Sequence, residues 1–439
     1  MRTLPVLLIT ASLGFGQSTL RLSLKRAVEI AVTPEGSPRV ALAEESIKQA
    51  EAKQAESRAA LLPDFESSIN DHRQTVNLQA FGLQFDIPFT GFAFPSIVGP
   101  FNIFDARATA SQSVFDFSLL RRYQASRVST AAVKSDFDAT RNQVTDQVAH
   151  AYVVALRTSA AVETEQADVD LSEALLKLAQ QQKEAGTGTG IEVTRAQVQL
   201  ANDRQRLLAA ENDRHRAVLN LLKAMGLKLD VNVELTDKLS FHAADVGTLE
   251  DALAAARKMR AELKAQKERT ESARLSYGAV KAERLPSVGA SADYGTIGTS
   301  VPNSQATYTY GVSVKVPLYD GGRRDARRSE SLSQYRQERI RTHDLEDQVD
   351  LEVRLAYDTI QSAAAQVQAA QEGLQLADNE VAQARRRYQA GVSNSIEVTD
   401  AQTRLVRARD NHIAALYIYN VARIDLATAT GTIREFVNQ

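Results

Sequence analysis

One segment of the chain occurs twice, 205 residues apart, and this duplication limits the possible folds more than any other feature. Residues 185–200 and 390–405 are identical at nine of 16 positions, and both contain Ala-Gly and, further on, Ile-Glu-Val-Thr. In each copy the glycine interrupts a long helical pattern. A unit that recurs at a fixed offset is typical of repeat architectures. The sequence therefore predicts two structural repeats, residues 17–226 and 227–439, each containing a helical hairpin.

The long helix before each glycine carries a coiled-coil pattern. In the second repeat an unbroken 4-3 spacing joins Val349, Val353, Ala356, Ile360, Ala363, Val367, Ala370, Leu374, Ala377 and Val381. The matching positions of the first repeat are Val144, Val148, Ala151, Ala155, Val162, Val169 and Leu176. Such seams predict helices that pack along their whole length. A second helix is expected to return after each glycine, over 191–225 and 396–429.

Extended chain precedes each long helix. The helical stretches 23–62 and 249–285 both end at Leu-Pro, and proline cannot continue a helix. Residues 307–318 then alternate strictly between apolar and other side chains, which predicts a strand. We expect four strands, in hairpins at about 63–116 and 286–320, each long enough to cross a bilayer. Four strands cannot close a barrel, and lipid leaves no strand edge unpaired, so the chain must oligomerise to cross a membrane.

The first 16 residues resemble a secretory signal peptide. A positive start, Met1-Arg2, precedes an apolar stretch and the small residues of Gly14-Phe15-Gly16. A buried strand or helix at the N-terminus is the alternative. No later apolar run approaches the ~20 residues of a membrane-spanning helix. The sequence thus predicts an exported protein that crosses a bilayer, if at all, by strands.

Composition and motifs exclude several kinds of chemistry. A formal net charge of -2 argues against nucleic acid as the main partner. The absence of cysteine excludes disulfides and thiolate metal sites. The six histidines show no metal-ligand spacing, and no nucleophile elbow, phosphate loop or dinucleotide loop is present. We therefore expect no enzymatic activity, no cofactor and no metal.

The order of these segments resembles that of the TolC-like outer-membrane efflux protein family, over essentially the whole mature chain. The two tip segments carry the resemblance, together with residues 316–322, Val-Pro-Leu-Tyr-Asp-Gly-Gly. The first copy lacks these glycines, at 114–118. The resemblance implies a mainly α-helical homotrimer with a 12-helix α-barrel on a 12-strand transmembrane β-barrel. It also implies the outer membrane of a Gram-negative-type bacterium, its lipid, a periplasmic adaptor and an inner-membrane transporter as partners.

The resemblance further implies which residues work at the periplasmic entrance. By their distance from the tip glycines, the gate and acidic ring fall on Glu192, Tyr388, Glu397 and Asp400. The adaptor contacts fall on Gly186, Thr187, Gly391 and Val392. Ser393 stands where the family has a gate arginine, and residues 385–387, all arginine, lie one turn away. The predicted function is the exit duct of a tripartite efflux or type I secretion system, with the cargo left open.

Simpler interpretations stand beside these. Glu192 and Glu397 could be acids that favour the positive N-terminal ends of their helices. Tyr388 and the arginines could lie on a solvated face, and Gly186 and Gly391 are turn-forming residues in any case. As a whole, the chain could be a secreted or periplasmic coiled-coil scaffold without channel activity. A periplasmic adaptor is a third class, but two full hairpins do not fit it.

Overall fold

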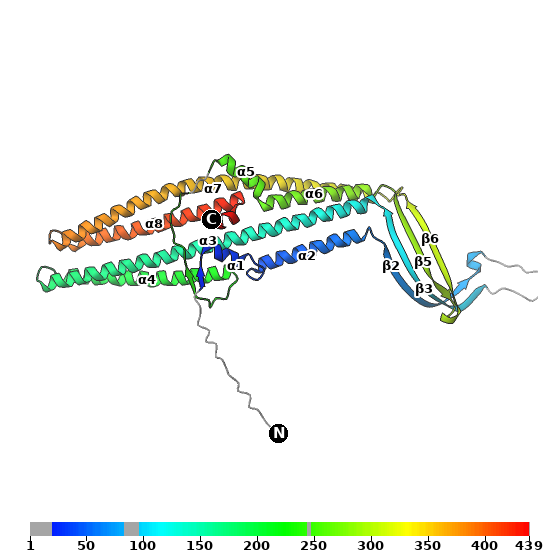
Figure 1. Ribbon diagram of the computed structural model, residues 1–439, viewed down its shortest axis with the longest axis horizontal. Coiled ribbons are helices and arrows are strands. Elements are labelled where there is room, and N and C mark those ends of the chain that lie inside the picture. Colours follow the sequence, from blue (N-terminus) through cyan, green and yellow to red (C-terminus); the bar gives the residue numbers. More distant parts are fainter. Residues whose placement is uncertain (1–19, 83–95, 244–246, 439) are drawn as a thin grey trace, which may run out of the picture. The chain divides into compact units, whose positions relative to one another are not determined.

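The computed structural model describes residues 20–82, 96–243 and 247–438 (Figure 1). The expected signal peptide at 1–16 lies outside these ranges. The chain divides into two compact units. Within the described residues, the first unit comprises 20–46, 134–264 and 343–438, and the second comprises 47–133 and 265–342.

The described chain is mainly helical, and its helices confirm the predicted hairpins. They are α1 (Leu24–Ala31), α2 (Pro38–Ala59), α3 (Phe117–Glu184), α4 (Gly190–Ala224), α5 (Leu249–Met259), α6 (Ala261–Ala282), α7 (Arg323–Gln389), α8 (Ser395–Thr430) and α9 (Ile433–Asn438). One glycine segment joins α3 to α4, and the other joins α7 to α8. No described helix combines the length and apolar character needed to cross a membrane.

The helix expected to run through 249–285 is instead two helices, because the backbone is extended at Arg260. The Arg260 guanidinium lies 2.7 Å from a Glu352 carboxylate oxygen and donates to the carbonyl of Ala429. Gly431 ends α8 with a positive φ of 79°. It lies against the backbone of Arg260, because a Cβ at Gly431 would be only 2.9 Å from the backbone nitrogen of Arg260. Packing against the end of α8 therefore favours the break.

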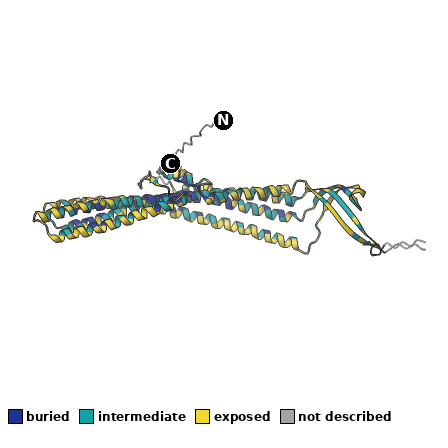
Figure 2. Ribbon diagram, turned by 90° about the horizontal axis from the view of Figure 1, so that it is seen from below, coloured by how far each residue is buried: buried dark blue, intermediate teal, exposed yellow. Residues whose placement is uncertain are grey.

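The predicted heptad seams are largely buried. The ribbon in Figure 2 shows buried residues, in dark blue, along the helices. Val349, Val353, Ile360 and Val367 are each at most 2 % exposed, and so are Val144 and Val148. Tyr152 is also buried in the first unit, where its hydroxyl donates 2.9 Å to the Leu22 carbonyl. These seams form the cores that hold the helices of the first unit together.

The second unit contains a four-stranded antiparallel sheet in the order β2-β3-β5-β6. Its strands are β2 (Asp64–Asn77), β3 (Ile97–Phe115), β5 (Ser287–Gly298) and β6 (Ser304–Lys315). All four lie where the sequence predicts them, although β6 ends before Pro317 rather than at 318. A short parallel pair in the first unit, β1 (Leu20–Leu22) with β4 (Val233–Leu235), was not predicted.

The register of the sheet separates its two faces by chemistry. Paired residues share a face, so one face carries Phe65, Ala110, Ala292 and Tyr310 in one row and Ser67, Ala108, Tyr294 and Tyr308 in the next. The opposite face carries Glu66, Thr109, Asp293 and Thr309 in one row and Ser68, Arg107, Gly295 and Thr307 in another. On that face Arg107 pairs with Asp105 at 2.6 Å. The sheet is thus apolar and aromatic on one side and polar and charged on the other.

Candidate functional site

The two hairpin tips share one turn geometry. Thr187 N–H donates to Gln182 carbonyl oxygen at 2.9 Å, and Val392 N–H donates to the Arg387 carbonyl at 3.0 Å. The glycines before these donors, Gly186 and Gly391, have φ of 75° and 72°. This is a Schellman motif, in which glycine takes the left-handed conformation and the last helix carbonyls are satisfied. The duplicated sequence therefore encodes a duplicated turn.

The helices that follow the tips begin with different caps. In the first tip the Glu192 carboxylate accepts from the Thr189 backbone N–H at 2.8 Å and from its hydroxyl at 3.2 Å. In the second tip the Asn394 side chain accepts from the N–H groups of Ile396 and Glu397. Glu192 thus satisfies its own helix terminus, as the simpler interpretation supposes, while Glu397 is left free for another partner.

Tyr388 and Glu192, predicted as gate residues from opposite tips, lie close together in the structure. Tyr388 is only 6 % exposed and packs with Val398, Ala401 and Leu405 of α8. Its hydroxyl has no hydrogen-bond partner among the described residues. Burial, and the negative charge of Glu192, raise the pKa of this hydroxyl. Tyr388 is therefore a buried residue of the tips, contrary to the alternative of a solvated one.

A cavity of about 30 Å³ lies between the two tips, beside this pair. Its lining includes Glu192, Arg195 and Gln199 of α4, Tyr388 of α7, and Ser395 and Gln402 of α8. The hydroxyl of Ser395 also has no partner among the described residues. A space of this size, with two unpaired hydroxyls in its lining, can hold one water molecule.

The other two predicted residues lie at the surface of this single chain. Glu397 pairs with Arg387 at 3.0 Å, and both side chains are about half exposed. Asp400, one turn further along α8, is exposed. The adaptor-contact positions Thr187 and Val392 are exposed as well. Arg387, one of the three arginines at 385–387, thus pairs with a predicted acid of the ring, near the position where Ser393 stands in place of the family arginine.

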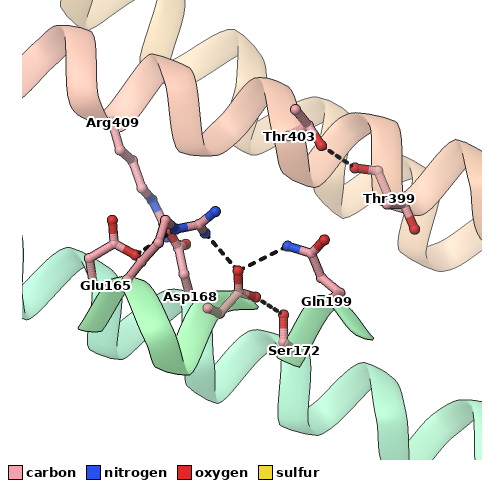
Figure 3. A network of polar contacts seen from close by, with 9 residues as sticks. Glu165, Asp168, Ser172, Gln199, Thr399, Thr403 and Arg409 are labelled. Atoms are coloured by element: carbon pink, nitrogen blue, oxygen red, sulfur yellow. Dashed lines mark hydrogen bonds and ion pairs between the residues drawn. The ribbon is translucent and has the colours of Figure 1, made fainter. Parts of the chain in front are cut away.

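Sequence reasoning missed a buried polar cluster further along the same helices (Figure 3). Its members are Glu165, Asp168 and Ser172 of α3, Gln199, Asp203 and Arg206 of α4, and Arg409 of α8. Asp203, which is 1 % exposed, accepts from Ser172, from Gln199 at 2.9 Å and from Arg206 at 2.6 Å. Asp168, which is 4 % exposed, accepts from Arg409. The Asp168–Arg409 pair joins the first hairpin to the second.

The two buried carboxylates differ in how well they are satisfied. Both oxygens of Asp203 accept hydrogen bonds, whereas one oxygen of Asp168 has none among the described residues. Burial raises the pKa of Asp168 to about 6, although the Arg409 guanidinium opposes the shift. Burial disfavours a charge that its neighbours compensate incompletely. Asp168 therefore takes up a proton more readily than an ordinary aspartate does.

A second charged group, formed by Asp146 and His150 of α3 with Asp425 of α8, also joins the hairpins. The His150 Nε2 lies 3.5 Å from Asp146 and 3.0 Å from Asp425. Their ligand-type atoms all lie within 4.8 Å, which is close enough to suggest a metal site. However, the hydrogen bonds to Asp146 and Asp425 raise the pKa of His150 to about 10. In its protonated form the imidazole pairs with both carboxylates and links α3 to α8.

The fold and the site together define a class: a duplicated helical-hairpin protein with an amphipathic four-stranded sheet. The family model described as outer membrane efflux protein matches residues 33–227 and 252–432. The chain therefore belongs to the outer membrane efflux protein family, and its location is the outer membrane.

Two curated relatives have low sequence identity to this chain. The outer membrane efflux protein BepC of Brucella suis is 26 % identical over 265 residues, which are 58 % of this chain and 56 % of BepC. The alkaline protease secretion protein AprF of Pseudomonas aeruginosa is 24 % identical over 340 residues, 74 % of this chain and 69 % of AprF. The chain thus aligns with little more than half of BepC.

Solved structures share the fold at lower identity. The CmeC outer membrane channel of Campylobacter jejuni matches with a TM-score of 0.79 and 17 % identity, over 93 % of this chain and 85 % of CmeC. The outer membrane protein VceC of Vibrio cholerae matches with a TM-score of 0.77 and 19 % identity, over 93 % of this chain and 96 % of VceC. The channel fold is therefore common to all three chains.

Proposed function

We propose that this chain is one subunit of a homotrimeric outer-membrane channel that serves as the exit duct of a tripartite efflux or type I secretion system. The observation that carries the proposal is the two-faced sheet of the second unit. Tyr308, Tyr310 and Val312 are all more than two-thirds exposed on its apolar face, while Arg107 and Asp293 lie on the opposite face. One face suits lipid and the other suits a water-filled lumen.

The edges of the sheet support a trimer. Among the described strands, β2 and β6 each pair on one side only. In lipid these free edges need partners, which other copies of the chain would supply. Two copies would form eight strands, whose interior fills with side chains, whereas three would form a 12-strand barrel with an open lumen. The helical hairpins of three chains would extend this lumen as a 12-helix α-barrel.

The hairpin tips supply the proposed entrance. Tyr388 and Glu192 join the two tips of one chain, and three-fold symmetry would bring Glu397 and Asp400 of each chain together as acidic rings. The exposed turns at Gly186, Thr187, Gly391 and Val392 are the proposed contacts with a periplasmic adaptor, which would connect the channel to an inner-membrane transporter. One relative is named an efflux protein and the other a protease secretion protein, so these names support both the efflux and the secretion alternative.

Purification in detergent followed by native mass measurement tests the assembly. We expect a trimer that also conducts ions in planar lipid bilayers. A stable, non-conducting monomer would reject the channel and favour the coiled-coil scaffold.

Replacing Glu397 and Asp400 together with alanine tests the entrance. Removing both rings should reduce cation selectivity and weaken block by multivalent cations, because a narrow ring of like charges concentrates counter-ions. Loss of Glu397 also frees the positive charge of Arg387, which strengthens the expected change. Tyr388→Phe is the control, since it keeps the ring and the net charge and should leave selectivity unchanged. Unchanged selectivity in the double variant would mean that these acids do not face the pore.

A further inference from the structure

The buried polar cluster connects the two hairpins through a single guanidinium. Arg409 of α8 reaches Asp168 of α3, and its second terminal nitrogen lies 3.9 Å from Asp378 of α7. The remaining contacts of the cluster lie within the first hairpin, between α3 and α4. Any movement of one hairpin away from the other at this level must separate Asp168 from Arg409 and expose the Asp168 carboxyl to water.

Negative charge is in excess around this contact. Glu165, Asp168 and Asp203 lie with Arg206 and Arg409, so three carboxylates share two guanidiniums. The partly exposed Asp378 adds a fourth acid beside Arg409. Asp203 already accepts from three donors and Glu165 is paired with Arg206 at 3.0 Å. The uncompensated charge therefore falls on Asp168, which has one oxygen without a partner among the described residues.

We propose that the cluster takes up one proton on Asp168, and that this proton favours the arrangement in which the two hairpins are packed together. The side chain is 4 % exposed in this arrangement and becomes hydrated when the hairpins separate. A carboxyl group is easier to protonate where its charge is poorly solvated. The packed state thus binds the proton more tightly than the separated state, and acid shifts the equilibrium toward packing.

The direction of this effect is opposite to that of an ordinary salt bridge. A carboxylate that is stabilised by its partner has a lowered pKa and loosens in acid. The pKa of Asp168 is instead raised from 3.8 to about 6, because burial outweighs the attraction of Arg409. Burial also raises the pKa of Asp410 and lowers that of His412, both on α8. In acid Asp410 therefore adds to the effect and His412 opposes it, and the Asp168→Asn variant isolates the part that belongs to Asp168. Acid should therefore tighten the contact.

Hydrogen–deuterium exchange of the purified full-length chain tests the proposal. Protection factors, corrected for the intrinsic pH dependence of exchange, should rise in α3 around 165–175 and in α8 around 405–412 when the pH falls from 7.5 to 5. The two pKa values predict a rise of about tenfold. Asp168→Asn cannot titrate, so this variant should lose the pH dependence. Equal wild-type protection at both pH values, or an unchanged pH dependence in Asp168→Asn, would overturn the proposal.

Two variants separate the proton from general damage to the cluster. Asp203→Asn removes part of the acceptor for Ser172, Gln199 and Arg206 and should lower protection at both pH values while keeping the pH dependence. Glu380→Gln breaks an exposed pair with Arg404 inside the second hairpin and should behave as the wild type. Loss of the pH dependence in Glu380→Gln would contradict a specific role for Asp168.

The consequence for the entrance rests on the proposed channel function. If separated hairpins widen the entrance, the wild type should spend less time open in planar bilayers at pH 5 than at pH 7.5, and Asp168→Asn should show no such difference. Conductance tests the channel and hydrogen exchange tests the proton on Asp168, so each proposal can be rejected without the other. Absence of any conductance, with the exchange result intact, would reject the channel, whereas a conducting trimer without the exchange effect would reject the proton on Asp168.

Discussion

In the first hairpin α3 and α4 pack around polar side chains, whereas in the second hairpin four of the six equivalent positions hold small apolar residues and the other two, Arg404 and Asn411, are exposed. Moving 205 residues along the chain, Glu165, Asp168, Ser172 and Asp203 become Ala370, Gly373, Ala377 and Ala408. Both hairpins keep the same turn and the same helix order. The backbone of the repeat therefore has the same turn and helix order with polar or with small apolar side chains between its helices.

The two hairpins therefore differ in the kind of contact that holds their helices together. Small side chains let α7 and α8 approach closely, and Leu175 of α3 packs into the same apolar cluster. The first hairpin buries carboxylates that must be paired, and it takes one of the pairing cations, Arg409, from α8. The two hairpins are thus joined by an apolar contact through Leu175 and by a charged contact through Arg409.

The largest expected effect comes from removing the best-satisfied acid of the first hairpin. Asp203→Ala leaves Ser172 and Gln199 without their acceptor and Arg206 with one fewer carboxylate, and should destabilise the chain by about 3–5 kcal/mol. Chemical unfolding followed by circular dichroism measures this. Glu173→Gln, which breaks an exposed pair with Arg204 in the same hairpin, should cost less than about 1 kcal/mol. Similar costs for both would mean that the cluster contributes no more than a surface pair.

Overpacking the small seam of the second hairpin should have the next largest effect. Ala401 of α8 is fully buried in an apolar cluster with residues of α7 and with Leu175 of α3. Ala401→Leu should destabilise by about 1–3 kcal/mol in the same unfolding measurement. Ala401→Ser adds a single atom and should cost less. If leucine is tolerated as well as serine, then α7 and α8 are not held at close approach.

The heptad pattern in the sequence differs between the two long helices, and it predicts the apolar seam of α7 better than the partly polar seam of α3. In α7 every 4-3 position is apolar. In α3 the pattern beyond Ala155 keeps only every second position, at Val162, Val169 and Leu176. The positions left out are Thr158, Glu165 and Ser172, and the last two belong to the buried polar cluster. A gap in a heptad pattern is thus a signal of a buried polar site.

Other features of the site depend on contacts that a linear pattern does not contain. The turn at each glycine and the strands follow from local propensity and alternation, and the sequence predicts them. The approach of Glu192 to Tyr388, and of Arg409 to Asp168, joins residues about 200 positions apart. The break at Arg260 likewise follows from packing against the end of α8 rather than from its local sequence.

A smaller, pH-dependent effect should come from the other link between the hairpins. Because the pKa of His150 is raised from 6.5 to about 10, its contribution is complete below pH 6.5 and is lost as the pH rises toward 10. The thermal unfolding midpoint of the wild type should fall over this window, and His150→Gln should remove that part of the fall. His343→Gln, at an exposed position near Asp347, is the matched control. An equal slope in the wild type and His150→Gln would contradict the assigned pairing.

The smallest expected difference lies between the two tips, which have the same turn but different first-turn acids. Glu192→Ala removes the acceptor of the Thr189 N–H and hydroxyl, and the loss of this cap should cost about 1 kcal/mol. Glu397→Ala leaves the Asn394 cap in place and breaks only the exposed pair with Arg387, which should cost about 0.2–1 kcal/mol. Amide exchange at the starts of α4 and α8 resolves the two, because only Glu192→Ala should increase fraying of its helix. Equal fraying at both helix starts would mean that Glu192 does not act through its cap, and its negative charge beside Tyr388 would then be its main role.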